Sequence, residues 1–400
     1  MKIVEINASN YGSTGNIMIG ITEHLRESGH EVLVCYPATS RNQARTVEGA
    51  CVIGTRIGRN IGLNLSKWTG REDRLFRFAT RKLLRTIDRF QPDVIHLHNI
   101  HGWYLNFPML FDYIKRKHVR VVWTFHDCWP VTGHCPHFEM IGCDKWKTRC
   151  GDCPIYRDYP ESRVDNSRRL HTIKKQAFLG VENLTIVTPS RWLADIAGQS
   201  YLKDYPVEVV HNGIDLDIFK PVPSDFRQRF QCENKKLLLG VAFGWNKRKG
   251  LDVLVRLAKD LDDAYQIVLV GTDEAVESNL PEKIIAIRRT HSREELAAIY
   301  SAADLLVNPT REDTFPTVNM EALACGTPVL TFSTGGSPEI LDNTCGCVVR
   351  KDDYGALKEA VIRIFEKPFS AEDCRKRALS FSRSAMLVSA ARILVPVDEC

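Results

Sequence analysis

Residues 308–330, NPTREDTFPTVNMEALACGTPVL, predict a polar loop, a short helix and a tight turn at the end of a strand. The strand is the buried apolar run at 305–307 just before them. Pro316 is expected at the first helical position, where its missing N–H is not needed. Gly326 is expected to cap the end of the helix. Such a turn places free backbone N–H groups and the positive end of a helix dipole at the carboxyl edge of a sheet, which predicts a diphosphate site.

Two carboxylates are expected on one side of this pocket. Asp313 precedes the helix and Glu321 lies within it, eight residues later. At about 1.5 Å per helical residue, they would stand several ångströms apart. One is therefore expected to bind hydroxyl groups beyond the phosphates, and the other hydroxyl groups on the nucleoside side. The alternative is an ordinary amphipathic helix with a solvated Glu321.

The same stretch resembles the signature of the family 4 glycosyltransferases, a retaining group with the GT-B fold. That signature has an acid, a Phe, a second acid eight residues after the first, and a Cys-Gly-x-Pro turn. The matching positions here are Asp313, Phe315, Glu321 and 325–328. The family usually has Glu at the first acid, so Glu312 is an alternative for the role of Asp313. The resemblance implies an α/β protein with two Rossmann-like parallel-sheet domains facing across a cleft.

The composition predicts a soluble globular protein of two or three domains. The 400 residues carry a formal net charge of +5, which does not by itself favour nucleic acid as a partner. No apolar run approaches the ~20 residues of a membrane span, and Glu5 and Asn7 interrupt the apolar core that a signal peptide needs. Thirteen cysteines without a secretion signal predict reduced thiols and a cytoplasmic protein.

Strands and helices alternate along the chain, which predicts parallel sheets covered on both faces. The family resemblance places the change of domain near the Asn-Gly-Ile-Asp turn. We therefore expect an N-terminal acceptor-side domain at 1–210, with a cysteine-rich insertion at 128–153, and a nucleotide-sugar-binding domain at 211–378. A closing helix is expected at 372–394, and the resemblance implies that residues 379–400 return to the first domain.

The first strand, at 2–6, leads into the loop 7–15 and a helix expected from Asn16. This loop lacks the GxGxxG spacing of a dinucleotide fingerprint. In the family, the matching loop lies near the acceptor and the donor diphosphate. The resemblance therefore makes Gly12 and Gly15 candidates for donor binding, and a plain turn is the alternative.

Two consecutive strands of the N-terminal half end in histidine. His98 ends the strand at 92–98, and His126 ends the strand at 121–127 with Asp127 beside it. The carboxyl ends of strands in open α/β sheets are where ligands bind. The family motif at the second strand carries an active-site histidine, matched here by His126.

Three cations follow another buried strand and suit a diphosphate: Lys247, Arg248 and Lys249. The family usually pairs an early Arg in this loop with a Lys just before the second Gly. Lys249 matches the Lys, but Gly244 or Trp245 stands where the Arg is expected. Lys247 or Arg248 must substitute, or the phosphate is held differently; a solvated charge run is the alternative.

Residues 56–89 hold ten basic side chains against three acidic ones, interleaved with apolar residues. A basic amphipathic helix of this kind can lie on anionic lipid. The alternative is a solvated helix packed on its own domain.

The segment 128–153 contains five cysteines. The CxxC of Cys150 and Cys153 has metal-ligand spacing, and Cys135 and Cys143 could complete four thiolates around a structural zinc ion. The spacings of eight, seven and three residues are irregular for a zinc ribbon, and free thiols are the alternative. The segment resembles an insertion in some exopolysaccharide-type members of the family.

The resemblance implies transfer of a sugar from a UDP- or GDP-linked donor to a saccharide or lipid-linked acceptor, with retained anomeric configuration. His126, Lys249 and Asp313 are the expected catalytic residues, and cations of the chain replace a divalent metal, so that no cofactor is required. The expected donor-binding residues are Gly12, Gly15, Asn212, Lys247, Arg248, Glu312, Phe315, Pro316, Thr317, Val318 and Glu321. Peripheral contact with the inner face of an anionic membrane is a further expectation.

Two rival functions remain open at this point. A nucleotide-sugar epimerase on the same scaffold would convert the donor without an acceptor. A non-enzymatic zinc-knuckle protein would place the basic segment 56–89 on nucleic acid. The second rival leaves the two phosphate-pocket loops unexplained, and no nucleic-acid partner is expected.

Overall fold

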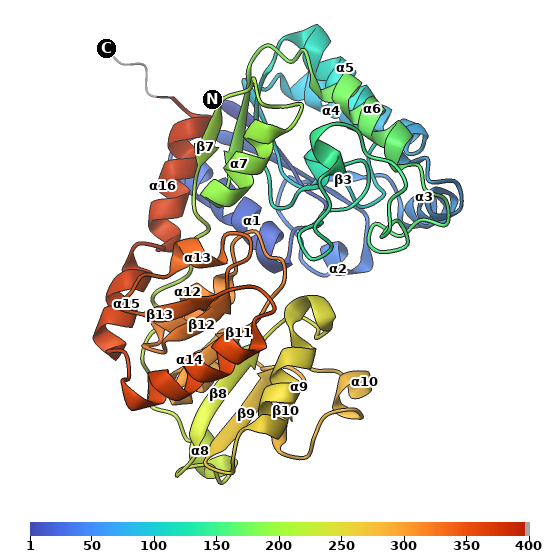
Figure 1. Ribbon diagram of the computed structural model, residues 1–400. Coiled ribbons are helices and arrows are strands. Elements are labelled where there is room, and N and C mark those ends of the chain that lie inside the picture. Colours follow the sequence, from blue (N-terminus) through green and yellow to red (C-terminus); the bar gives the residue numbers. More distant parts are fainter. Residues whose placement is uncertain (397–400) are drawn as a thin grey trace. The chain divides into compact units, whose positions relative to one another are not determined.

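The computed structural model describes residues 1–396 and divides into two compact units (Figure 1). The first unit comprises Met1–Val210 together with residues 387–396, and the second comprises His211–Met386. Each unit is built on one parallel sheet with a hydrophobic core on each of its faces. The prediction of parallel sheets covered on both sides is therefore confirmed.

The first unit has seven parallel strands in the order β3-β2-β1-β4-β5-β6-β7. The strands are β1 (Lys2–Ile6), β2 (Glu31–Pro37), β3 (Cys51–Ile53), β4 (Val94–Leu97), β5 (Arg120–Thr124), β6 (Leu184–Thr188) and β7 (Val207–Val209). The helices are α1 (Gly12–Glu27), α2 (Ser40–Gln43), α3 (Arg56–Thr69), α4 (Arg77–Phe90), α5 (Phe107–Lys117), α6 (Ser167–Phe178), α7 (Arg191–Gln199) and the part of α16 (Arg383–Leu394) from Leu387 onward. Because β1 pairs with β4 and β4 with β5, residues from these three strands meet at one edge of the sheet.

The C-terminal helix α16 ends against the first sheet, as the predicted fold requires. Leu394 is fully buried in the same core cluster as Val122 of β5. The Arg120 guanidinium donates hydrogen bonds to the carbonyl groups of Ile393 and Leu394. These bonds satisfy carbonyl groups that the end of a helix leaves without intrahelical partners.

The second unit has six parallel strands in the order β10-β9-β8-β11-β12-β13. The strands are β8 (Lys236–Val241), β9 (Tyr265–Val270), β10 (Ile284–Ile287), β11 (Leu305–Asn308), β12 (Val329–Phe332) and β13 (Gly346–Val349). The helices are α8 (Phe226–Arg229), α9 (Leu251–Asp260), α10 (Glu274–Glu277), α11 (Arg293–Ala302), α12 (Thr317–Ala324), α13 (Ser337–Ile340), α14 (Tyr354–Glu366) and α15 (Ala371–Leu379). Short 3-10 turns occur in both units. The first unit contains η1 (Glu72–Arg74), η2 (Trp129–Val131) and η3 (Lys145–Lys147), and the second contains η4 (Lys247–Lys249).

The prediction of one closing helix at 372–394 was wrong, because the helix is interrupted between α15 and α16. Phe381 is buried between them, and its carbonyl accepts a hydrogen bond from the Ile214 N–H at 2.9 Å. Ser382 forms a β-bridge with Ile214. This pairing with a distant segment overrides the helical periodicity of the local sequence.

Helix boundaries also differ from the expectations at two places. Pro316 is not the first residue of α12 but its N-cap, with an extended ψ of 114°, and the helix begins at Thr317. The first helix begins at Gly12 instead of Asn16.

Among the residues that the structure describes, no helix is long and apolar enough to cross a lipid bilayer.

Candidate functional site

The loop between β11 and α12, residues 309–316, is fixed by the loop that follows β12. The Gly336 N–H donates to the carbonyl of Asp313 at 3.2 Å. Gly335 has a φ of 53°, and a Cβ atom there would lie 1.7 Å from the Asp313 carbonyl oxygen. Glycine at this position is therefore required for the two loops to meet at the carboxyl edge of the sheet.

Two of the predicted catalytic residues are in contact, Lys249 of the 3-10 turn η4 and Asp313 of this loop. Lys249 Nζ lies 2.7 Å from Asp313 Oδ2, and both side chains keep about a fifth of their surface exposed, 20% and 21%. Glu312, the alternative acid, is 7% exposed, which favours Asp313 as the carboxylate that a ligand can reach. Lys247 is exposed and Arg248 is partly exposed on the same turn.

Arg311 braces the cationic turn, and sequence reasoning missed it. It is 7% exposed and forms ion pairs with Asp252 and Asp352, both at 2.7 Å. Its own N–H donates to the Arg248 carbonyl at 2.8 Å, and its guanidinium donates to the Lys247 carbonyl. Arg311 therefore holds the backbone of η4 beside the start of the loop 309–316. No local signal could have shown this, because the two acids lie 59 and 41 residues away in sequence.

The first turn of α12 faces the same loop. The N-cap residue Pro316 makes no side-chain hydrogen bond to this helix, and the N–H groups at a helix start are suited to an anion. Glu321 Oε2 accepts a hydrogen bond from the Tyr300 hydroxyl at 2.9 Å. Burial raises the pKa of Glu321, and the hydroxyls of Tyr300 and Thr317 act in the opposite direction.

Other predicted donor-binding residues have structural surroundings of their own. The Phe315 side chain is 2% exposed and stacks on His211, with ring centroids 4.8 Å apart. A Cβ atom on Gly15 would lie 2.6 Å from the carbonyl carbon of Asn10, so α1 requires glycine there. Gly12 has a φ of 70° at the start of α1, where a Cβ atom would meet nothing within 4 Å. Asn212 is partly exposed in the turn that opens the second unit.

Trp245 is excluded as a phosphate ligand by its own packing. Its side chain is buried, and its indole N–H donates to the Val270 carbonyl at 3.0 Å. If Trp245 is the residue that matches the usual arginine of the family, that position belongs to the core in this protein. The cations at 247–249 are the positive groups next to it in sequence.

In the first unit, strands β1, β4 and β5 join a carboxylate and histidines into one hydrogen-bonded chain. Glu5 of β1 accepts a hydrogen bond from His96 of β4 and another from His98, which directly follows β4. Glu5 Oε1 lies 2.9 Å from His96 Nδ1, and Glu5 Oε2 lies 2.9 Å from His98 Nε2. His98 Nδ1 in turn lies 2.9 Å from His126 Nε2. A carboxylate within the apolar strand KIVEI could have marked Glu5 as a functional residue, but the sequence does not show which residues bind it.

The protons of this chain follow from the pKa values. Burial raises the pKa of Glu5, but His96 and His98 outweigh it and lower that pKa to about 2, so Glu5 only accepts. Burial, with His96, lowers the pKa of His98 to about 4. A neutral His98 that donates to Glu5 through Nε2 must accept through Nδ1, so His126 Nε2 is the donor. Burial lowers the pKa of His126 well below 6.5, and its proton therefore sits on Nε2, leaving Nδ1 as an acceptor.

A second pair ties the loops after β4 and β5 together. His101 Nε2 lies 2.9 Å from Asp127 Oδ2. Burial raises the pKa of Asp127, but His101 outweighs it and lowers that pKa to about 2. Asp127 also accepts from the Trp129 N–H at 2.9 Å. The backbone directly after His126 is thereby anchored.

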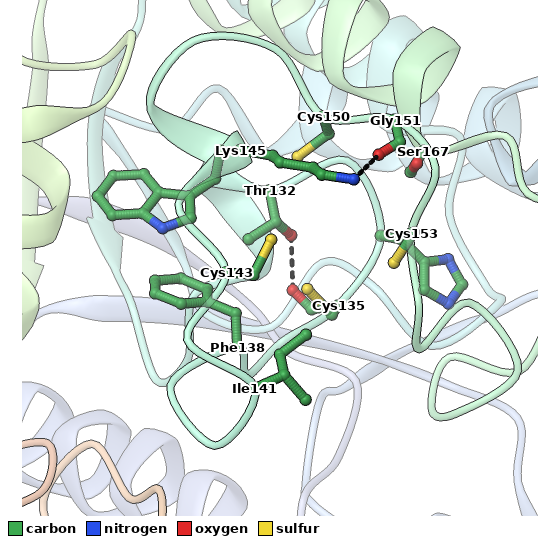
Figure 2. A pocket seen from close by; sticks show the side chains of 12 residues that line it. Thr132, Cys135, Phe138, Ile141, Cys143, Lys145, Cys150, Gly151, Cys153 and Ser167 are labelled. Atoms are coloured by element: carbon green, nitrogen blue, oxygen red, sulfur yellow. Dashed lines mark hydrogen bonds between the residues drawn. The ribbon is translucent and has the colours of Figure 1, made fainter.

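The four cysteines predicted as metal ligands line the same cavity of the first unit, but their sulfur atoms do not all lie within 4.8 Å of one another. Cys135, Cys143, Cys150 and Cys153 line one small cavity in the segment after β5 (Figure 2). Twelve cysteines of the described chain have free thiols.

Comparison with known proteins gives two matches to family models. Residues 15–218 match the model described as Glycosyltransferase Family 4, and residues 235–367 match Glycosyl transferases group 1. The putative colanic acid biosynthesis glycosyl transferase WcaC of Escherichia coli (strain K12) is 28% identical over 295 residues, which are 70% of this chain and 71% of that protein. A D-inositol 3-phosphate glycosyltransferase of Mycolicibacterium smegmatis is 27% identical over 208 residues, 47% of this chain and 48% of that protein.

Solved structures resemble the whole chain in fold. Sucrose-phosphate synthase from Thermosynechococcus elongatus has a TM-score of 0.71 at 18% identity, with 98% of each chain covered. HepE of Anabaena in complex with UDP has a TM-score of 0.69 at 15% identity, covering 98% of this chain and 99% of that one. These similarities confirm the predicted GT-B architecture. Since the Family 4 model alone spans more than half of the sequence, the chain belongs to glycosyltransferase family 4 and is a glycosyltransferase.

Proposed function

We propose that this protein moves a sugar from a UDP- or GDP-linked donor to a hydroxyl group of a saccharide or lipid-linked acceptor, with retention of the anomeric configuration. The observation that carries the proposal is the Lys249–Asp313 pair, which lies beside the start of α12. The relatives support it: HepE has been solved with UDP and with UDP-glucose, and WcaC is named for colanic acid biosynthesis. A role in polysaccharide synthesis is part of the proposal.

The chemistry requires positive groups at the leaving nucleoside diphosphate. Lys249 and the N–H groups of Thr317 and Val318 would stabilise the charge that develops on the departing phosphate oxygen. Asp313 would bind hydroxyl groups of the donor sugar, and Glu321 hydroxyl groups of the nucleotide ribose. His126 would act on the reacting sugar, by orienting or stabilising it.

A thermal-shift screen of nucleotide sugars, followed by mass spectrometry of the transfer product, tests this function. A donor that raises the melting temperature and yields a glycosylated acceptor is the expected result. Conversion of the donor to an isomer in the absence of any acceptor would instead identify an epimerase.

Because the chain supplies its own cations to the diphosphate, we expect the transfer rate to be unchanged in excess EDTA. The melting temperature must be followed in the same samples, because a chelator could also remove a structural ion. A loss of rate at constant melting temperature, restored by Mg²⁺ or Mn²⁺, would show that a divalent ion takes part in the reaction.

A lipid-linked acceptor is supported by the outer surface of α3. Ile57, Ile61, Leu65 and Trp68 are 47% to 75% exposed and recur at three- and four-residue spacing, which places them on one helix face. Basic residues of the segment 56–89 lie between and after these apolar residues in the sequence. Apolar and basic groups together favour peripheral binding to an anionic membrane.

We expect the double variant Ile57→Ser, Ile61→Ser to bind vesicles containing anionic lipid several-fold more weakly than wild type in co-sedimentation. The reason is the loss of apolar area that inserts among the acyl chains, so donor binding in solution should not change. Ile362→Ser removes an apolar side chain that is 39% exposed on α14, and serves as the matched control. Equal vesicle binding by all three proteins would contradict the membrane proposal.

A further inference from the structure

The cysteine-rich segment folds around a cavity of about 20 Å³, which is room for one small ion or water molecule (Figure 2). Four thiols from separate parts of the segment border it: Cys135, Cys143, Cys150 and Cys153. His134 belongs to the same wall. Thiolate sulfur and imidazole nitrogen are the preferred protein ligands of zinc, which takes four of them in structural sites.

The turn that carries Cys150 and Cys153 is held in place by hydrogen bonds. The Gly133 N–H donates to Cys150 Sγ at 3.2 Å, a bond that stabilises a thiolate. Lys145 Nζ donates to the carbonyl groups of Gly151 and Asp152, each at 2.9 Å. A positioned ligand shell of this kind is what metal sites require of their surroundings.

His134 provides an independent indication of a ligand. Its side chain is 6% exposed, and its Nε2 atom is buried without any hydrogen-bond partner. A buried polar atom of this kind is normally satisfied, and here it belongs to a residue of the cavity wall.

Lys174 fixes the backbone next to the cavity by hydrogen bonds. It is fully buried, and its Nζ donates to the carbonyls of Trp129 and Thr132 at 2.9 and 3.0 Å. Thr132 lines the cavity, so these bonds fix part of its wall.

The other cluster of possible metal ligands is already paired. Within residues 1–396, a carboxylate oxygen of Glu5 and ring nitrogens of His96 and His98 lie within 4.8 Å of one another. The hydrogen bonds from the two histidines to Glu5 account for this short spacing. The thiols around the cavity are spread more widely than this. Zinc at ~2.3 Å from each sulfur would draw them inward, and Cys143, Cys150 and Cys153 are only partly buried.

We propose that this wall binds one structural zinc ion through Cys135, Cys143, Cys150 and Cys153, with His134 bordering the ion. Four protein ligands leave no open position on the ion, so its role is to hold the segment together and not to take part in transfer. The segment begins directly after His126 and Asp127, and the Trp129 N–H binds Asp127. The ion would therefore stabilise the backbone that positions His126.

The test is the metal content of the full chain, purified under reducing conditions without a metal-affinity step. We expect about one zinc per chain by elemental analysis, and tetrahedral thiolate absorption when Co²⁺ replaces it. Cys150→Ser and Cys153→Ser should each lose zinc. Cys347→Ser, a partly buried thiol of β13 in the second unit, should retain it as the matched control.

The wild-type protein decides the matter even if the cysteine variants fail to fold. Absence of zinc, together with no cobalt spectrum after reconstitution, would overturn the proposal. A disulfide between Cys135 and Cys153 in the freshly isolated protein would overturn it as well. None of these readouts depends on sugar transfer, so a failure of the proposed function would leave the result intact.

Discussion

Lys249→Ala is expected to lower kcat/KM for sugar transfer by roughly 10- to 150-fold while the melting temperature stays close to that of wild type. The estimate follows from the loss of one charge-assisted contact to the diphosphate, about 1.5–3 kcal/mol. Stability should change little, because Lys249 pairs with Asp313 where both side chains are in contact with solvent. Steady-state kinetics with varied donor concentration and thermal unfolding of the same preparation measure the two effects.

The matched control is Lys259→Ala, which removes an exposed lysine from the last turn of α9 in the same unit. It should leave both kcat/KM and stability unchanged. Asp313→Asn separates two roles of the pair: if Lys249 only neutralises Asp313, the double variant should recover activity that Lys249→Ala has lost. Wild-type donor affinity in folded Lys249→Ala would remove this residue from the donor site.

The strands and the deciding loop were predictable because their signals are local. Buried apolar runs indicated the strands of both sheets, and residues 308–330 contain their own strand end, helix and turn. Lys249 and Asp313 were each identified from their own loops. Their contact required the order β8-β11, in which strands distant in sequence become neighbours.

What sequence reasoning missed is non-local. Arg311 stands inside the deciding stretch, yet its function depends on Asp252 and Asp352, and nothing in the stretch indicates partners so far away. Glu5 likewise lies 91 and 93 residues from the two histidines that it binds. In both cases the contact exists only once the parallel strands are in register, and a single sequence does not show the register.

His126→Asn is expected to reduce the turnover number at least tenfold, about 1.4 kcal/mol, with a near-normal melting temperature. The hydrogen-bond chain from Glu5 adds a sharper expectation, because it fixes which nitrogen of His126 carries the proton. Burial keeps the pKa of His126 well below 6.5, so the ring stays neutral as the pH rises above that value. Activity should therefore show no step from this residue between pH 6.5 and 8, and should fall only when the pH drops far enough to protonate it.

His98 and His96 provide a matched pair of substitutions for this mechanism. Both are about 1% exposed and both bind Glu5, but only His98 continues to His126. Replacing either with Gln should lower the melting temperature by a similar amount, since each change breaks one buried hydrogen bond to Glu5. Only His98→Gln should also lower turnover, and the double variant with His126→Asn should be no slower than His126→Asn alone. Equal turnover losses in the His96 and His98 variants would mean that Glu5 supports the core and does not orient His126.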